Sequence, residues 1–191
     1  VIQQDIDAVV EVLKSDFLTQ GPVTPKFENA LSSFTGAKYA LAVNSATSAL
    51  HVACLSLGLS EGDWLWTSPI SFVASSNVGL FCGAKIDFVD IDSKTYNICP
   101  DRLEEKLKNA SLNGRIPKVL VPVHLCGQSC DMSKIKKVCD EYNIKVIEDA
   151  SHAIGGYYRD EPIGNCKYSD ITVFSFHPVK IITTAEGGVA L

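Results

Sequence analysis

Short apolar runs alternate with segments of helical periodicity along much of the chain. Runs that are typical of buried strands occupy 39–43, 63–68, 85–90, 118–123 and 145–147. Segments whose apolar residues recur every three or four positions, and which therefore predict helices, occupy 49–57, 70–81, 101–109 and 133–142. This alternation from residue 39 to 150 predicts an α/β protein with a mostly parallel sheet covered by helices.

Further elements are predicted on both sides of this alternating region. Two amphipathic helices are expected at 5–18 and 24–34, and on their own they indicate only a pair of surface helices. A glycine-containing hairpin is expected over 155–164, followed by a β-branched and aromatic strand over 171–176. Residues 189–191 have the composition of the beginning of another strand.

Composition and charge narrow the possible functions. Hydrophobic residues make up 46% and charged residues 20% of the 191 residues, which is an ordinary globular composition. A net charge of -5 gives no electrostatic reason to expect binding to nucleic acid, and no apolar run is long enough to span a bilayer. The polar first residues lack the features of a signal peptide. From the charge and the apolar runs together, we expect neither nucleic acid nor a membrane as a partner.

The seven cysteines are odd in number and irregularly spaced. Such a set favours reduced thiols and a cytoplasmic protein over a disulfide framework. Cys126 and Cys130 with nearby His124 could be part of a metal site, but no second pair of ligands follows at zinc spacing. A metal site is therefore not expected.

A small polar turn, Asn44-Ser45-Ala46-Thr47-Ser48, joins a predicted strand to a predicted helix. The free N–H groups and partial positive charge of a helix N-terminus bind anions, and small residues let a phosphate approach closely. The simpler alternative is an ordinary N-cap at Asn44 or Ser45.

Phe72 and the segment around Asp149 also follow predicted strands, at the sheet edge where α/β proteins bind ligands. The flat ring of Phe72 could stack on a pyridine ring, or it could simply pack in the core. A buried Asp149 needs a cationic or hydrogen-bonding partner, and a pyridinium nitrogen is one such partner. Alternatively, Asp149 is a helix N-cap and His152 a polar residue near a helix start.

One lysine, Lys180, lies just beyond the strand predicted over 171–176, which Pro178 ends because proline cannot donate to a sheet. A polar, glycine-containing loop over 183–188 follows. A lysine amine at such a position could attack a carbonyl to form a Schiff base, provided that it is neutral. Alternatively, it is an ordinary surface lysine.

Four segments in order, NSATS (44–48), SPISF (68–72), EDASHA (148–153) and SFHPVK (175–180) with its following TT-EGG, carry a family resemblance. They resemble the DegT/DnrJ/EryC1/StrS family of nucleotide-sugar aminotransferases, which depend on pyridoxal 5'-phosphate (PLP). The sequences of these segments are most similar to the branch that makes 4-amino sugars for pseudaminic acid. The resemblance implies the large domain of the PLP-dependent transferase fold type I.

The resemblance implies a role for each matched residue. Lys180 is implied as the catalytic residue that holds PLP covalently, and its being a lysine speaks against the dehydratase relatives, which have histidine there. Ala46, Thr47 and Ser175 are implied as phosphate contacts. Three residues are implied to contact the pyridine ring: Phe72 by covering it, Asp149 at its nitrogen and His152 near its hydroxyl. The place of His152 is often held by glutamine in the family, and histidine at this place is known in the pseudaminic branch.

The implied reaction moves an amino group from an amino acid, by analogy L-glutamate, to C4 of a nucleotide-linked 4-keto-6-deoxy sugar. Pyridoxamine phosphate (PMP) would be the aminated form of the cofactor, and the product would serve lipopolysaccharide or flagellin glycan biosynthesis. The family also implies a homodimer, with the first helix and the LTQGP loop near the active site and the dimer contact.

The chain ends at Leu191, in what resembles the beginning of a strand, whereas family members continue. We therefore expect 1–191 to be a partial large domain that is truncated at its C-terminus and lacks the smaller C-terminal domain. Two alternatives follow. The chain could be a catalytically incompetent fragment that binds cofactor or nucleotide-sugar or dimerises. It could also be an enzyme of this fold with another substrate, such as a 3-keto sugar or an amino acid in a lyase reaction.

Overall fold

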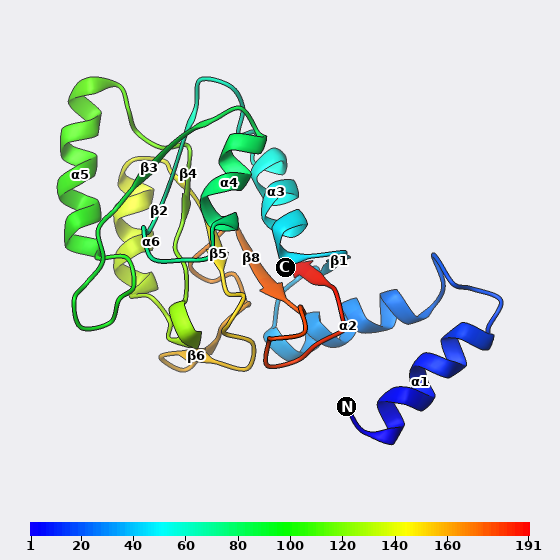
Figure 1. Cartoon of the computed structure of the whole chain (residues 1–191). Coiled ribbons are helices and arrows are strands. Elements are labelled where there is room, and N and C mark those ends of the chain that lie inside the picture. The colour runs from blue at the N-terminus through cyan, green and yellow to red at the C-terminus, as the bar shows by residue number, and fades with distance from the viewer.

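A seven-stranded sheet forms the centre of the molecule in the computed structural model, which describes residues 1–191 (Figure 1). Its order is β1-β9-β8-β5-β4-β2-β3. In sequence order the strands are β1 (Leu41–Val43), β2 (Trp64–Thr67), β3 (Lys85–Phe88), β4 (Val119–Val121), β5 (Lys145–Asp149), β8 (Ile171–Ser175) and β9 (Gly188–Ala190). All neighbours from β3 to β8 pair in parallel, and only β9 runs antiparallel to β1 and β8. The predicted mostly parallel sheet is confirmed.

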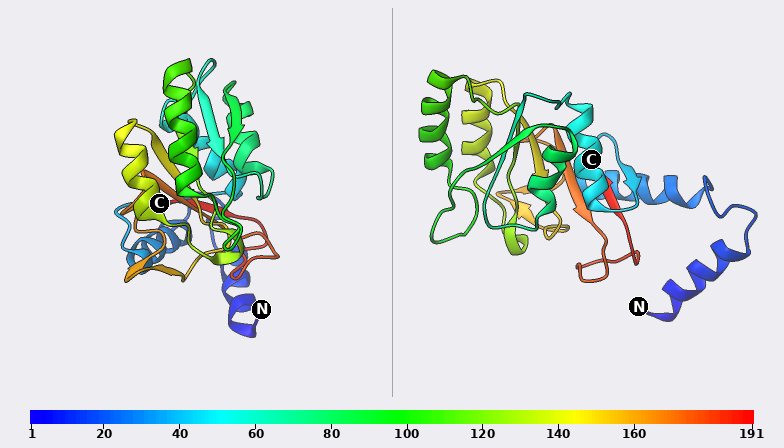
Figure 2. Two further views of the ribbon diagram at one scale, coloured as in Figure 1. Left: turned by 90° about the vertical axis from the view of Figure 1, so that its left-hand side faces the viewer. Right: turned by 45° about the horizontal axis from the view of Figure 1, so that its top comes forward.

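Helices cover both faces of this sheet (Figures 1 and 2). Their bounds are α1 (Gln3–Lys14), α2 (Val23–Thr35), α3 (Ala46–Ser56), α4 (Ala74–Phe81), α5 (Pro100–Asn113) and α6 (Met132–Glu141), with a 3-10 turn, η1 (Leu125–Gly127). The predicted hairpin is present as β6 (Tyr157–Tyr158) and β7 (Glu161–Pro162), which pair antiparallel outside the main sheet.

Alternate residues of the central strands enter two separate hydrophobic clusters. Trp66, Leu120 and Val146 pack under α5 and α6, whereas their neighbours Leu65 and Val119 pack under α3 and α4. Successive side chains of a strand point to opposite faces, so strands buried on both faces must be apolar at consecutive positions. This explains why these segments read as continuous apolar runs in the sequence.

Most element boundaries differ from the sequence predictions by a few residues, and two of these differences concern the edge of the sheet. Helix α3 begins at Ala46 instead of residue 49, because Ser45 serves as its N-cap. Helix α4 begins at Ala74 instead of residue 70, so Phe72 lies in the preceding turn. That turn is closed by the Ser68 hydroxyl, which donates to the carbonyl of Ile70 at 3.0 Å.

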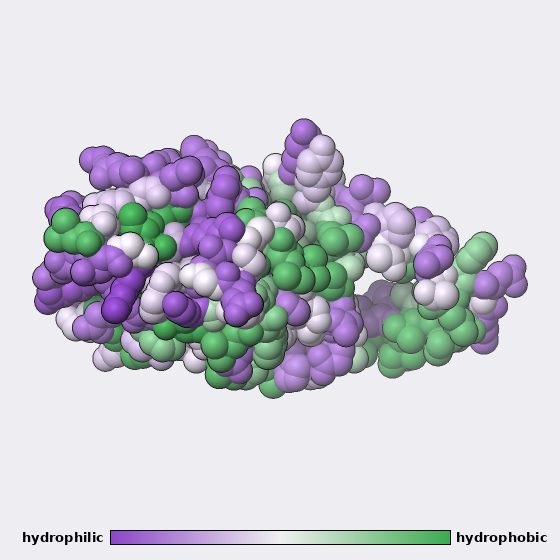
Figure 3. Space-filling model, turned by 90° about the horizontal axis from the view of Figure 1, so that it is seen from above, coloured by the Kyte–Doolittle hydropathy of each residue, from purple (hydrophilic) through white to green (hydrophobic).

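Helix α1 extends away from the rest of the chain and has no buried residue (Figures 1 and 2). Its apolar residues Ile6, Val9, Val10 and Leu13 are exposed, and hydrophobic surface is visible over this arm in Figure 3. The expected pair of surface helices is thus present, with α2 contributing buried Leu31 to the core. None of the helices combines the length and apolar character that crossing a membrane would require.

Leu120 in β4 is fully buried beneath α5 and α6, whereas Leu112 near the end of α5 is 84% exposed. We expect Leu120→Ala to lower the free energy of unfolding by about 2–5 kcal/mol because it leaves a cavity in the close-packed core. Leu112→Ala should change it by less than about 0.5 kcal/mol. Urea unfolding of both variants checks this, and equal midpoints would contradict the core described above.

Candidate active site

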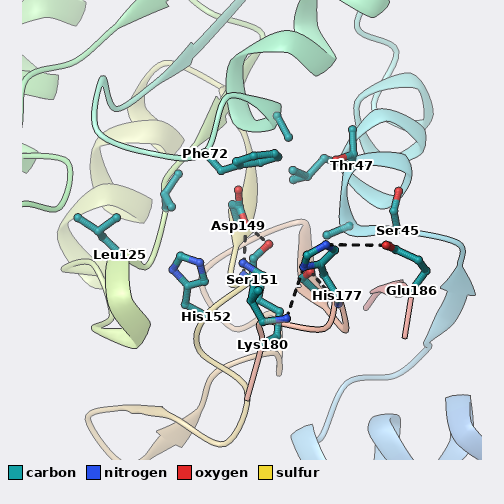
Figure 4. Close-up of a pocket in the computed structure, with 17 residues that line it drawn as sticks. Ser45, Thr47, Phe72, Leu125, Asp149, Ser151, His152, His177, Lys180 and Glu186 are labelled. Carbon is teal, nitrogen blue, oxygen red and sulfur yellow. Dashed lines mark hydrogen bonds and ion pairs between the residues drawn. The ribbon is translucent and has the colours of Figure 1, made fainter. Parts of the chain in front are cut away.

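A cavity of about 320 Å³ opens at the edge of the sheet where the parallel strands end (Figure 4). The carboxyl ends of parallel strands meet at one edge, which brings residues from distant segments together. All seven residues that the sequence singled out line this cavity, namely Ala46, Thr47, Phe72, Asp149, His152, Ser175 and Lys180. In particular, Asp149 and Lys180 lie at the same end of the sheet, as a single ligand that contacts both would require.

The N-terminus of α3 forms one wall of the cavity. Ser45 caps the helix by accepting a hydrogen bond from the Ser48 backbone N–H at 3.1 Å. The N–H groups of Ala46 and Thr47 belong to the first turn of the helix and so have no carbonyl partner one turn earlier. Together with the helix dipole, these groups provide a site that fits an anion such as a phosphate.

Gly188 in β9 lets the cap of α3 lie against the sheet. A Cβ atom at this position would be 2.4 Å from the Ala46 nitrogen and 2.6 Å from the Ser45 carbonyl oxygen. Real Cβ atoms do not approach backbone atoms so closely, so any larger residue would push the α3 N-terminus away from the strand. The second glycine of the EGG sequence is therefore explained by packing under the anion site.

Three hydrogen bonds orient the carboxylate of Asp149, whose residue is only 4% exposed. The Ser75 hydroxyl donates to Oδ2 at 2.7 Å, and the Ser151 hydroxyl and N–H donate to Oδ1 at 2.6 and 3.2 Å. These donors are neutral, so they hold the carboxylate in place without cancelling its charge. A buried carboxylate of this kind favours a cationic partner, and a protonated pyridine nitrogen fits that requirement.

Sequence reasoning missed Ser75 and Ser151. Ser151 follows Asp149 by two residues, which is the spacing of a local Asx-type turn, so this contact could have been anticipated. Ser75 is 74 residues away from Asp149 in the sequence, and no local pattern signals that contact.

A polar loop between β8 and β9 presents Lys180 to the cavity (Figure 4). The loop closes on the Phe176 carbonyl, which accepts hydrogen bonds from the Thr184 N–H and the Thr183 hydroxyl, both at 3.0 Å. The Lys180 N–H donates to the carbonyl of His177 at 2.9 Å. As predicted, this segment is a tight polar loop and contains no helix.

His177 and Glu186, which the sequence reasoning did not single out, face each other in this loop and also line the cavity. His177 Nε2 lies 3.8 Å from a carboxylate oxygen of Glu186 (Figure 4). Both side chains are substantially exposed, so this contact adds little to stability. Their place beside Lys180 makes them part of the cavity wall.

The remaining predicted residues lie on different walls. Phe72 is 69% exposed and presents its ring to the cavity, so it is not a core residue (Figure 4). Ser175 is the last residue of β8 and is buried. Burial, and then the positive charge of Lys180, lower the pKa of His152 from its ordinary value of 6.5, while Asp149 opposes the shift. The His152 imidazole is therefore neutral near pH 7.

The side chains considered for a metal site have different surroundings. Cys126 is exposed, whereas Cys130 is buried and its thiol donates to the Val123 carbonyl at 3.2 Å. No group of three or more His, Cys, Asp or Glu side chains in the structure is arranged to hold a metal ion.

Comparison with known proteins gives consistent results. The model of the DegT/DnrJ/EryC1/StrS aminotransferase family matches residues 1–191. The UDP-4-amino-4,6-dideoxy-N-acetyl-beta-L-altrosamine transaminase of Campylobacter jejuni (serotype O:2) is 44% identical over 189 residues, which are 99% of this chain and 48% of that protein. The chain thus spans about half the length of such curated relatives.

Solved structures show the same relationship. Spr1654 from Streptococcus pneumoniae, in its PMP-form, superimposes with a TM-score of 0.91 at 32% identity, over 100% of this chain and 50% of that one. PseC from Helicobacter pylori, an aminotransferase of pseudoaminic acid biosynthesis, superimposes with a TM-score of 0.90 at 36% identity, over 100% of this chain and 49% of that one. The predicted fold, that of the large domain of PLP-dependent aminotransferases, is confirmed.

The pKa of His152 tests the arrangement of the cavity without any ligand. Replacing the charged side chain in Lys180→Met should raise this pKa toward 6.5, because a nearby positive charge disfavours the imidazolium form. Asp149→Asn should lower it further, since the opposing negative charge is lost. An NMR titration of the imidazole protons measures both shifts.

Lys94→Met, at an exposed residue outside the cavity, serves as the control and should leave the pKa of His152 unchanged. Because the pKa of His152 is lower in the folded chain than in the unfolded chain, the unfolded chain is protonated at His152 at a higher pH than the folded chain. The His152 contribution to the free energy of unfolding should therefore fall as the pH drops from 6.5 toward the folded-state pKa. The same pKa in Lys180→Met and in the unsubstituted protein would show that Lys180 does not face His152.

Proposed function

This chain belongs to the DegT/DnrJ/EryC1/StrS aminotransferase family, and from that premise we propose that it is the PLP-binding large domain of a nucleotide-sugar aminotransferase. One observation carries the proposal: Lys180, the buried carboxylate of Asp149 and the N-terminus of α3 line a single cavity. An amine, a fixed negative charge and an anion site are the three features that PLP requires of a protein. The PLP-form and PMP-form structures of Spr1654 support this choice of cofactor.

We propose that the phosphate lies at the N-terminus of α3. There the N–H groups of Ala46 and Thr47 are free to donate, and the Thr47 and Ser175 hydroxyls can add hydrogen bonds. Gly188 keeps this helix end close to β9, which leaves no room for a side chain beneath the phosphate.

The ring would lie between Phe72 and the tip of β5. Asp149 Oδ would hold the proton on the pyridine nitrogen, since Ser75 and Ser151 fix this carboxylate without neutralising it. Phe72 would cover one face of the ring and exclude water from it. A neutral His152 can donate or accept a hydrogen bond at the ring hydroxyl without adding charge.

PLP, when bound, acts as an electron sink, which lets an amino group pass from one carbon to another. The chain's own part in that chemistry would centre on Lys180 Nζ, which would hold the cofactor covalently and, once released, move the proton between the reacting carbons. The polar loop that closes on the Phe176 carbonyl would keep Nζ on the cavity side.

For the whole protein we propose an amino acid donor, L-glutamate by analogy, and a nucleotide-linked 4-keto-6-deoxy sugar that is aminated at C4. The C. jejuni relative is named as a transaminase of a UDP-4-amino-4,6-dideoxy sugar, and the H. pylori neighbour acts in pseudoaminic acid biosynthesis. By the same analogy we propose a cytoplasmic homodimer that serves the synthesis of a surface amino sugar.

The first test of this function is covalent labelling. We expect the full-length protein incubated with PLP to develop a visible absorption band, and borohydride treatment to fix a pyridoxyl group on the peptide that contains Lys180. Lys180→Ala should lose both the band and the label, because no other lysine lines the cavity. Lys94→Ala serves as the control and should retain both. Labelling of another lysine in the unsubstituted protein would refute the role given to Lys180.

The acceptor can be tested with UDP- and dTDP-linked sugars that carry a keto group at C3 or C4, each with L-glutamate as the donor. We expect 2-oxoglutarate to form with a 4-keto sugar and the product to carry its amino group at C4, which NMR of the product measures. Turnover with 3-keto sugars alone would contradict amination at C4. A PLP-loaded protein that aminates none of these sugars would contradict the proposed substrate class.

A further inference from the structure

A buried pair of ionisable side chains, His124 and Glu148, lies directly behind the cavity and has no role in the function proposed above. Their side chains are 0% and 7% exposed, and His124 Nε2 is 2.7 Å from Glu148 Oε2. Burial of such groups is costly unless their hydrogen bonds are satisfied, so a pair at this place calls for an explanation.

The partners of the pair determine which nitrogen carries the proton. The backbone N–H of Cys130 donates to His124 Nδ1 at 3.2 Å, so Nδ1 acts as an acceptor. The imidazole proton must then lie on Nε2, which donates to the carboxylate of Glu148. The Thr172 hydroxyl donates to the other oxygen of that carboxylate at 3.4 Å. Both side chains are therefore held in fixed orientations.

The pair lies on the face of the sheet opposite to the cavity. Glu148 is paired in register with Thr172 and Asp149 with Val173, and consecutive residues of β5 point to opposite faces. Asp149 accordingly faces Ser75 of α4, whereas Glu148 faces His124. The side chains of these two consecutive acids thus lie on opposite faces of the sheet.

Backbone contacts connect the pair to the cavity. The His124 N–H donates to the Asp149 carbonyl at 3.0 Å, and the Asp149 N–H donates to the Pro122 carbonyl at 2.9 Å. His124 also begins the turn η1, in which the Gly127 N–H donates to the His124 carbonyl at 3.1 Å.

Leu125 of this turn lines the cavity. Gly127 packs so closely against the His152 segment that a Cβ atom at its position would be 2.8 Å from the His152 carbonyl oxygen. A displacement of the turn would therefore displace His152.

We propose that His124 and Glu148 are positioning residues, whose hydrogen bond fixes the ends of β4 and β5 so that Asp149 and the η1 turn keep their places in the cavity. Neither side chain touches the cavity, so neither is a catalytic residue. The proposal rests on the proposed function only in so far as Asp149 contacts a PLP ring. The positions of the strand ends and of the η1 turn are properties of the chain alone and do not depend on PLP.

Three variants test this proposal. Glu148→Ala removes the carboxylate that His124 Nε2 contacts. Glu148→Gln keeps an oxygen that can accept from Nε2, and His124→Gln keeps a donor toward Glu148 but leaves the Cys130 N–H without its acceptor. Thr67→Val is the matched control, because the fully buried Thr67 hydroxyl donates to the Val121 carbonyl at 2.7 Å between neighbouring strands and Thr67 does not line the cavity.

The first measurement is amide hydrogen exchange in the cofactor-free full-length protein. In Glu148→Ala we expect the amides of His124, Gly127 and Asp149 to exchange at least about tenfold faster than in Thr67→Val, because the strand ends open locally. Glu148→Gln should restore slow exchange. If Glu148→Ala does not fold, His124→Gln provides the comparison and should show faster exchange at the same amides.

The second measurement is the equilibrium dissociation constant for PLP, from absorbance titration. We expect Glu148→Ala to weaken PLP binding by about tenfold, the lower end of the loss seen when residues that orient metal ligands are removed, and Glu148→Gln to recover most of it. Thr67→Val should bind PLP like the unsubstituted protein.

Unchanged exchange at the three amides, or PLP affinities equal to that of Thr67→Val, would overturn the positioning role and leave the pair as a contributor to stability alone. Failure of the unsubstituted protein to form a Lys180-dependent band would instead count against the proposed function. In that case the exchange rates still decide whether the pair positions the strand ends.

Discussion

Parallel pairing of β5 with β8 places Asp149 beside Val173, and the arrangement of the cavity depends on this register. Backbone hydrogen bonds hold β5 on both sides as far as its last residue: the Asp149 N–H donates to Pro122 and the Ala150 N–H to Val173. A slip of one residue would turn Asp149 away from the cavity and direct Glu148 into it. The register of the sheet therefore determines which side chains face the cavity.

The electrostatics of the cavity follow from where each charged group is attached. The positive end of α3 and the carboxylate of Asp149 belong to different elements and lie on different walls, while Lys180 enters from a loop. A ligand that is anionic at one end and cationic at the other satisfies both fixed charges at once. This requirement is more selective than the presence of any single residue, since each residue alone has an ordinary structural explanation.

Much of the fold could be predicted because its information is local. Apolar runs predicted the strands, and the family resemblance of four short motifs implied seven residues that line one cavity. The rest depends on contacts between distant segments. The hydrogen bond from Ser75 to Asp149 and the start of α4 at Ala74 leave no periodic signal, and the antiparallel direction of β9 depends on how the Lys180 loop folds back. The hydrogen bond between His124 and Glu148, which lies 24 residues away, is another such contact.

The consecutive acids of β5 illustrate why burial alone does not identify a functional group. Glu148 and Asp149 are both buried, yet the sheet separates them. His124 and Thr172 hydrogen-bond to Glu148 on the face away from the cavity, whereas Asp149 lines the cavity, where its serine contacts orient it and leave its charge uncompensated. A carboxylate that the protein holds in place but does not neutralise is one that a cationic ligand can stabilise. Of the two acids only Asp149 lines the cavity, so it is Asp149 that is available to a ligand.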